Sequence, residues 1–175
     1  MQHKAVAFTG PSGSGKTTLI EKIARRLTSS RQVAIIKHDP KDKAQFDREG
    51  KDSDRFFKSG ADVAVLSPSR TTLFSHRSRS VEEIAALFAP FDLLLVEGLK
   101  TLPLPRIGVF RGEIDPDYLP VLQAVAVDHT VDPSTLATLP EEVEVLDLND
   151  IDAVISWIDR HAITLKGTSN DANNF

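Results

Sequence analysis

The sequence has 175 residues, a length that suits one α/β domain with a core of its own. It carries 21 basic and 25 acidic residues, for a formal charge of −4, so its surface as a whole does not favour nucleic acid, and no nucleic-acid partner is expected. The absence of cysteine excludes disulfides and thiolate chemistry, and no secretory signal or long apolar segment is visible, so we expect a cytoplasmic protein without membrane contact.

The first predicted elements flank a glycine-rich loop. An apolar strand over residues 5–9 leads into it, and a helix over 17–27 follows. From Gly10 to Thr17 the sequence fits the phosphate-binding pattern G-x-x-x-x-G-K-[ST] at every fixed position. Lys16 should reach the β- and γ-phosphates of a nucleotide, and the Thr17 hydroxyl should ligate the Mg²⁺ that the phosphates share. The expected nucleotide-binding residues are Gly10, Ser12, Gly13, Ser14, Gly15, Lys16, Thr17 and Thr18.

A glycine-serine turn that only joins a strand to a helix is the alternative, but such a turn needs neither the lysine nor the hydroxyl. The next predicted strand, residues 32–36, ends at three polar residues that should lie near the phosphates, because the carboxyl ends of parallel strands face the ligand crevice. Residues 39–55 form a charged stretch. They predict either a segment that orders around γ-phosphate and Mg²⁺, with Asp47, Asp52 or Asp54 as a metal ligand, or a solvated loop; Asp54 is the candidate chosen.

A short helix over 53–60 and two strands, 62–67 and 70–76, come next. The strands should pair as an antiparallel hairpin at the edge of an otherwise parallel sheet. The basic residues between 70 and 79 either form an anion-binding patch or protect an exposed edge by charge. A helix over 80–88 precedes the second informative run of the chain.

That second run is a strand over 93–96, apolar throughout and ending at Glu97. It is typical of a Walker B strand buried on both faces. Glu97 is expected to hold Mg²⁺ through water or to polarise the attacking water, which makes Lys16 and Glu97 the candidate catalytic residues. A structural ion pair of Glu97 with Lys100 or Lys37 is the open alternative.

Strands are also predicted over 107–110, 124–127 and 143–148, followed by a helix over 151–163. Asp128 lies at the crevice end of its strand and is a candidate reader of guanine, although the full NKxD motif is missing. The predicted architecture is a three-layer P-loop NTPase α/β fold with a mostly parallel sheet and an antiparallel edge hairpin. It forms one nucleotide-binding domain over residues 1–165, with a disordered tail over 166–175.

Several of these blocks together resemble the MobB family, the GTP-binding adapter proteins of molybdopterin-guanine dinucleotide biosynthesis. The blocks are residues 10–19, 36–39, 50–53, 55–56, 59–61 and 95–100. The resemblance implies a homodimer that binds GTP with Mg²⁺, hydrolyses it weakly, and works beside MobA, the guanylyltransferase that joins GMP to molybdopterin. Molybdopterin itself is a further candidate ligand. The family's phosphate-binding positions fall on Gly13, Gly15, Lys16, Thr17 and Thr18, and its acidic strand end falls on Glu97.

Two other functions stay open. One is a small-molecule kinase that uses ATP, which usually needs an arginine-rich lid, whereas the clustered arginines here lie in the predicted hairpin. The other is an interaction module whose nucleotide is structural. No glutamine or arginine finger is placed by motif, so turnover is expected to be slow.

Overall fold

The computed structural model of the chain describes residues 3–45 and 47–165, which form two compact units. The larger unit comprises residues 3–38 and 81–165, and the smaller unit comprises residues 39–80. The single domain over 1–165 stays a prediction, because a division into compact units does not say whether they fold independently. The predicted tail, residues 166–175, lies outside the described residues.

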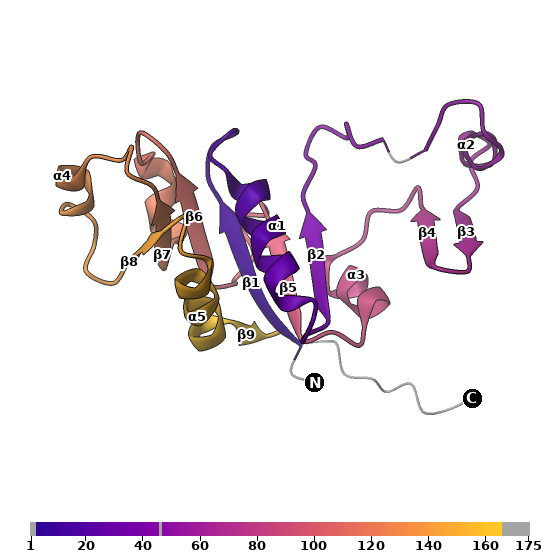
Figure 1. Cartoon of the computed structure of the whole chain (residues 1–175). Helices are drawn as coiled ribbons and strands as arrows, with labels where there is room; N and C mark the ends of the chain where they lie inside the picture. Colours follow the sequence, from indigo (N-terminus) through magenta and orange to yellow (C-terminus); the bar gives the residue numbers. More distant parts are fainter. Residues whose placement is uncertain (1–2, 46, 166–175) are drawn as a thin grey trace. The chain divides into compact units, whose positions relative to one another are not determined.

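A seven-stranded sheet forms the centre of the larger unit (Figure 1). Its strands are β1 (Lys4–Thr9), β2 (Val33–Lys37), β5 (Leu93–Glu97), β6 (Arg106–Phe110), β7 (Ala124–Val127), β8 (Glu144–Asp147) and β9 (Ile163–Thr164). The first six are parallel in the order β2-β5-β1-β6-β7-β8, and β9 pairs antiparallel with the start of β1. Strand β1 therefore lies between β5 and β6, and the loops that follow these three strands start at the same edge of the sheet.

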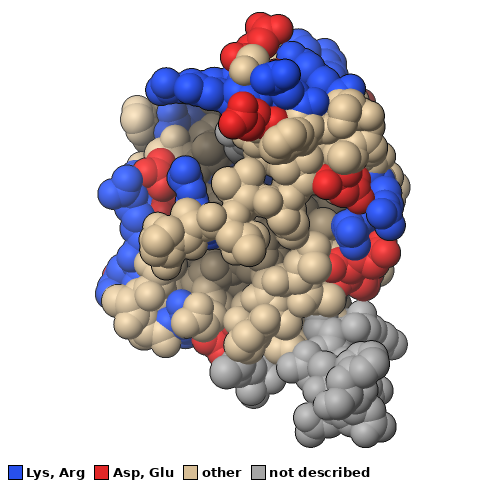
Figure 2. Space-filling view, turned by 90° about the vertical axis from the view of Figure 1, so that its right-hand side faces the viewer, with Lys and Arg blue, Asp and Glu red and all other residues tan. Residues whose placement is uncertain are grey.

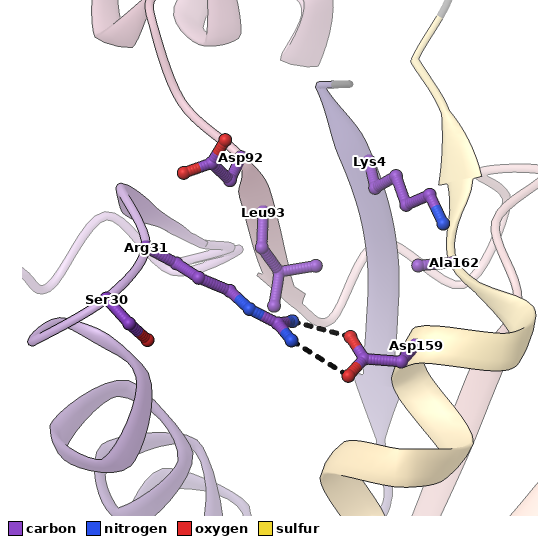
Figure 3. A pocket seen from close by; sticks show the side chains of 7 residues that line it. All are labelled: Lys4, Ser30, Arg31, Asp92, Leu93, Asp159 and Ala162. Atoms are coloured by element: carbon purple, nitrogen blue, oxygen red, sulfur yellow. Dashed lines mark hydrogen bonds and ion pairs between the residues drawn. The ribbon is translucent and has the colours of Figure 1, made fainter. Parts of the chain in front are cut away.

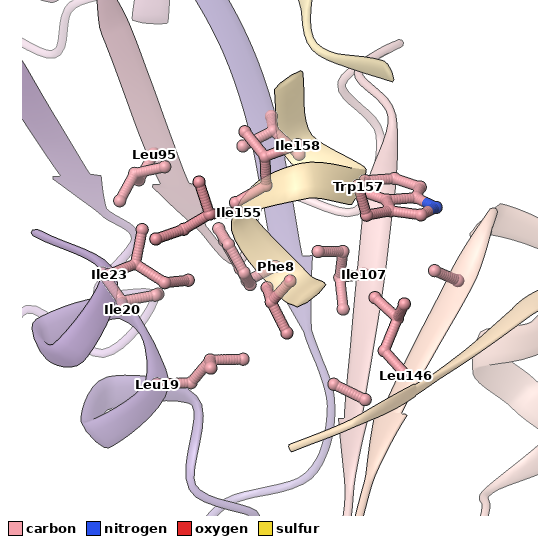
Figure 4. Packing of buried hydrophobic residues seen from close by; sticks show 14 of the residues in the cluster. Phe8, Leu19, Ile20, Ile23, Leu95, Ile107, Leu146, Ile155, Trp157 and Ile158 are labelled. Carbon is pink, nitrogen blue, oxygen red and sulfur yellow. The ribbon is translucent and has the colours of Figure 1, made fainter. Parts of the chain in front are cut away.

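Helices cover both faces of this sheet because its central strands are apolar on both sides. Val6 and Phe8 of β1 pack with α1 (Lys16–Leu27) and α5 (Ile151–His161), in a core that also buries Trp157 completely (Figure 4). The alternate residues of β1, Ala5 and Ala7, pack instead with α3 (Val81–Phe88). The predicted three-layer α/β fold with a mostly parallel sheet is thus confirmed.

Two short helical segments close a third core beside β6 and β7. They are the 3-10 helix η1 (Pro116–Val121) and helix α4 (Pro133–Leu136). Each begins at an aspartate whose side chain accepts a hydrogen bond from a backbone N–H two residues later, Asp115 for η1 and Asp132 for α4. Neither was predicted, since segments this short carry no helical period.

The smaller unit contains α2 (Asp52–Lys58) and a hairpin of β3 (Val63–Ser67) and β4 (Arg70–Phe74). The antiparallel hairpin was predicted and is present. However, it forms a two-stranded sheet of its own, so its predicted place at the edge of the parallel sheet is wrong. Its ladder hydrogen bonds run between β3 and β4, and most residues of both strands are exposed.

The surface carries charges of both signs. On the face shown in Figure 2, groups of lysine and arginine side chains adjoin aspartate and glutamate side chains, with uncharged residues between them. Within the smaller unit, Lys58 pairs with Asp54 at 2.9 Å and Arg77 pairs with Asp62 at 3.1 Å. Of the basic residues between 70 and 79, Arg77 thus has an acidic partner within the unit, and both interpretations of the group stay predictions. Among the residues that the structure describes, no helix is both long and apolar enough to cross a membrane.

Candidate nucleotide-binding site

The loop between β1 and α1 is shaped by glycines with positive φ. At Gly10, where φ is 139°, a Cβ atom would lie 2.3 Å from the carbonyl oxygen of Val109 on β6, so only glycine fits. Gly15, with φ 100°, precedes α1, and no side chain caps the first turn of that helix. The N–H groups of this turn therefore have no partner within the helix, and they provide the donors that a phosphate group needs.

Lys16 lies across this loop. Its Nζ donates hydrogen bonds to the carbonyl oxygens of Gly10, at 2.9 Å, and Pro11, at 2.6 Å. Partial burial lowers the pKa of Lys16, while the nearby Glu97 carboxylate acts in the opposite direction. The structure thus brings the ammonium group to the centre of the predicted cradle. Its contact with phosphate stays a prediction.

The hydroxyl groups of the loop fit a polar ligand. The Oγ atom of Ser14 is buried and has no hydrogen-bond partner among the described residues, although buried hydroxyls are normally paired. Ser12, Thr17 and Thr18 are exposed. With the free amides of the first turn, these groups suit an anion, and the Thr17 hydroxyl is accessible for a metal ion shared with that anion.

Glu97 ends β5 beside the strand that leads into the loop. Parallel pairing places it opposite Phe8 of β1 on one side and Lys37 of β2 on the other. Within residues 3–45 and 47–165, Glu97 forms no ion pair, and the ammonium of Lys100 instead lies 3.4 Å from the ring centre of Tyr118. The carboxylate is therefore available for water or a metal ion, as the Walker B interpretation requires.

A buried arginine fixes the loop that follows Glu97. Arg106 at the start of β6 is 1% exposed, and its guanidinium donates to the carbonyl oxygens of Gly98 (2.9 Å), Leu99 (2.9 Å) and Leu102 (3.1 Å). Burial lowers the pKa of Arg106, and arginine stays charged in spite of this. Gly98 and Leu99 have φ values of 89° and 49°, so the guanidinium holds a turn that only a few residue types adopt readily.

Asp128, the predicted guanine reader, lies after β7 and contacts two groups of this chain. Its Oδ1 accepts hydrogen bonds from the hydroxyl and the N–H of Thr130, and its Oδ2 lies 3.3 Å from Nε of Arg111. These hydrogen bonds from Thr130, together with the Arg111 charge, lower the pKa of Asp128. Both carboxylate oxygens thus already have a partner within this chain. Its reading of guanine stays a prediction.

Asp54, the predicted metal ligand, lies in the smaller unit. Its carboxylate accepts a hydrogen bond from the N–H of Gly50 at 2.8 Å and pairs with Lys58. The Gly50 hydrogen bond, with Lys58, lowers the pKa of Asp54. The described residues contain no cluster of three or more histidine and carboxylate side chains able to hold a metal by themselves. A Mg²⁺ ion bound largely by phosphates and water needs no such cluster, and the role of Asp54 stays a prediction.

Two cavities of the larger unit lie at opposite ends of the sheet. One, of about 670 Å³, is lined by the loops after β6 and β7, with Gly112, His129 and Asp132 among its residues. The other, of about 440 Å³, lies where β1 and β5 begin and is crossed by two hydrogen bonds between Arg31 and Asp159 (Figure 3). Only the first adjoins the loops that follow the carboxyl ends of the strands, as a nucleotide at the glycine loop would require.

Comparison with known proteins shows a similarity that includes the glycine-rich loop, Glu97, Arg106 and Asp128. The family model of molybdopterin guanine dinucleotide synthesis protein B, MobB, matches residues 5–128. A molybdopterin-guanine dinucleotide biosynthesis adapter protein of Haemophilus influenzae is 33% identical over 165 residues, which cover 88% of this chain and 86% of the relative. The adapter protein of Escherichia coli is 29% identical over 168 residues, 89% of this chain and 93% of the relative.

Solved structures show the same similarity. The crystal structure of a MobB protein homolog from Bacillus stearothermophilus superposes with a TM-score of 0.63 at 26% identity, covering 89% of this chain and 95% of the other. That of Bacillus subtilis MobB gives a TM-score of 0.66 at 26% identity, with 87% and 96% covered. The similarity thus extends over most of each chain, well beyond the glycine-rich loop.

Proposed function

Since the chain belongs to the MobB family of molybdopterin guanine dinucleotide synthesis proteins, we propose that it acts as an adapter in the synthesis of that dinucleotide and that it binds GTP with Mg²⁺ at the loop after β1. The adapter role rests on the family and on its named relatives. The choice of guanine rests on the family as well, and nucleotide binding rests on the site itself. The single observation that carries it is the loop of residues 10–17, where free helix amides, the Lys16 ammonium and the exposed Thr17 hydroxyl meet.

Each group of the site has a distinct task in this proposal. The N–H groups at the start of α1 bind phosphate oxygens, and Lys16 exchanges its carbonyl partners for the β- and γ-phosphates. Thr17 and, through water, Glu97 hold the Mg²⁺ ion, which neutralises charge on the phosphates. In weak hydrolysis, water adds to the γ-phosphorus as its bond to the bridging oxygen breaks, and Glu97 orients that water. The products are GDP and phosphate.

Guanine preference is the part of the proposal that identifies the nucleotide. A guanylyltransferase partner of the MobA type uses GTP, so an adapter that binds the same nucleotide suits that partner. The cavity between the loops after β6 and β7 offers room for a base at the edge of the sheet where the glycine loop also begins. Asp128 borders these loops, and its role toward the base is tested separately from phosphate binding.

Calorimetric titration of the purified protein with GTP, ATP, GDP and ADP, with and without Mg²⁺, tests the proposal. We expect tight binding of GTP that weakens when Mg²⁺ is removed, and weaker binding of ATP. A preference for ATP would contradict the GTP-dependent adapter and favour a kinase, whose hydroxylated acceptors would be screened next. Binding of none of the four nucleotides would refute the site.

Lys16→Ala isolates the phosphate cradle. Hydrogen bonds to charged groups contribute about 1.5–3 kcal/mol each, and Lys16 is assigned two phosphates, so loss of the ammonium should weaken GTP binding by at least about 100-fold while the fold is kept. Lys22→Ala, an exposed lysine on the same helix, is the matched control and should bind GTP as the wild type does. Equal affinities of the Lys16 and Lys22 variants would contradict the role given to Lys16.

The adapter role has its own test. We propose that the chain forms a homodimer and assists a MobA-type guanylyltransferase, with molybdopterin as a further candidate ligand. Light scattering during gel filtration measures the mass of the particle alone and with the purified enzyme, starting from 19.2 kDa for one chain. A monomer that neither binds the enzyme nor raises its rate of dinucleotide formation would contradict this role, whatever the nucleotide titrations give.

A further inference from the structure

Arg111 lies directly over the glycine loop. It follows β6, and its guanidinium packs beside Gly15, where a Cβ atom would lie 3.5 Å from both Nε and Nη2. Gly15 is the residue from which α1 begins, so the guanidinium lies next to the free amides of the first helical turn. Its side chain is 50% exposed, which leaves it accessible to a ligand that enters the loop.

A closed set of contacts holds Arg111 in this place. Asp128 pairs with its Nε at 3.3 Å, and the Thr130 hydroxyl donates to the other oxygen of Asp128. That same hydroxyl accepts a hydrogen bond at 2.8 Å from the N–H of Gly112, the residue next to Arg111. The contacts thus return to the neighbour of the residue where they began. They restrict a long side chain, which reduces the conformational entropy that it would lose on binding a ligand.

The sheet order determines which side of the loop Arg111 occupies. Strand β1 lies between β5, which ends at Glu97, and β6, which leads to Arg111. The carboxylate expected to act with Mg²⁺ and the guanidinium therefore flank the loop from opposite sides. On the side away from the metal, phosphate oxygens have no Mg²⁺ to neutralise them, and an arginine provides the planar pair of N–H donors that suits them.

We propose that Arg111 binds the α- and β-phosphates of the nucleotide and that Asp128 is its positioning residue instead of a reader of guanine. This inference rests on the proposed nucleotide binding at the loop. It assigns to the chain a phosphate-binding residue outside the glycine-rich motif. It also explains why both oxygens of Asp128 are engaged within the protein. A purely structural tie between the loops is the competing explanation, and it predicts no change in affinity at constant stability.

Arg111→Ala, titrated with GTP and GDP, tests the inference. Loss of a charge-assisted contact should weaken both nucleotides by about 10- to 100-fold, with their ratio unchanged, because both contain the α- and β-phosphates. Arg160→Ala is the matched control, since Arg160 has a similar exposure of 55% and an ion pair with Glu144 at 2.9 Å. That variant should bind within about twofold of the wild type.

The outcomes separate this inference from the proposed function. If Lys16→Ala abolishes binding and Arg111→Ala does not weaken GDP, the site stands and the role of Arg111 is refuted. A loss confined to GTP would place the guanidinium on the γ-phosphate and overturn the assignment. If Arg111→Ala is unstable, Arg111→Lys is used, which keeps the charge and loses the planar pair of donors. If Arg111→Lys binds GDP at least about threefold more weakly than the wild type, the inference is supported. If its affinity for GDP is unchanged, the inference is overturned.

Asp128→Asn distinguishes positioning from base reading. If Asp128 orients Arg111, the variant should lose a similar factor of affinity for GTP and ATP, and the loss should vanish when Arg111 is already alanine. If only GTP binding falls, or if the loss persists in the Arg111→Ala background, Asp128 acts on the base or independently, and its positioning role is overturned.

Discussion

Replacing Arg106 by methionine should destabilise the larger unit by about 2–4 kcal/mol. Methionine fills similar space but donates no hydrogen bond, so the carbonyl oxygens of Gly98, Leu99 and Leu102 lose their shared donor. Three hydrogen bonds to a charged group contribute roughly 4.5–9 kcal/mol, and the substitution also removes several kcal/mol of desolvation cost for a buried guanidinium. The difference between these two effects gives the expected loss.

Urea unfolding followed by tryptophan fluorescence measures this loss. Trp157 is the only tryptophan of the sequence and is fully buried in the core under α5, so it reports unfolding of the larger unit. Hydrogen exchange of the amides in residues 98–104 should accelerate in the variant. Arg25→Met, with its side chain 79% exposed, serves as the control and should stay within about 0.5 kcal/mol of the wild type. A loss below about 1 kcal/mol with unchanged exchange would refute the reasoning.

Two further changes test the glycine loop and the opposite end of the sheet. Gly10→Ala should lower the free energy of unfolding by at least about 2 kcal/mol, because of backbone strain and the 2.3 Å approach to the Val109 carbonyl, and should abolish GTP binding. Gly13→Ala is the control, because a Cβ there meets nothing within 4 Å, and its urea midpoint should fall less. Equal midpoints of the two variants would contradict the clash. Arg31→Gln should lose about 0.5 kcal/mol, a small value because both partners are partly exposed. Hydrogen bonding to Arg31 lowers the pKa of Asp159, so the difference in stability between the wild type and Arg31→Gln should be constant from pH 7 to 5 and shrink only as the pH falls below 3.8. A difference that fades by pH 5 would implicate another group.

Local patterns were sufficient to predict the centre of the site. The glycine-rich motif requires particular residues at fixed spacing, and the apolar run of β5 can be buried only between two layers. Both features depend on neighbouring residues in the sequence. The loop, the helix after it and the place of Glu97 at the end of a buried strand could therefore be predicted without knowledge of the whole fold.

Residues that depend on strand neighbours could not be predicted in this way. The register of β6 and β7 pairs Phe110 with Val127, so the next residues, Arg111 and Asp128, become neighbours. Each strand is followed directly by a charged residue, and this is the signal that the sequence carries for the pair. The sequence around Arg106 suggests an exposed strand end, and its burial arises because residues 98–102 fold over it. The sequence of the hairpin likewise predicts that its two strands pair with each other, but it does not indicate whether they join a larger sheet.

The neighbours of β1 determine when the site can exist during synthesis. Strand β1 pairs with β5, β6 and β9, all of which follow residue 92 in the chain. The glycine-rich motif leaves the ribosome early, but the Val109 carbonyl that frames Gly10 follows only after another hundred residues or so. Fragments from interrupted translation therefore carry the motif without its framework. These fragments should not compete with the finished protein for nucleotide. Until β5 and β6 are synthesised, the apolar strand β1 stays exposed and accessible to chaperones.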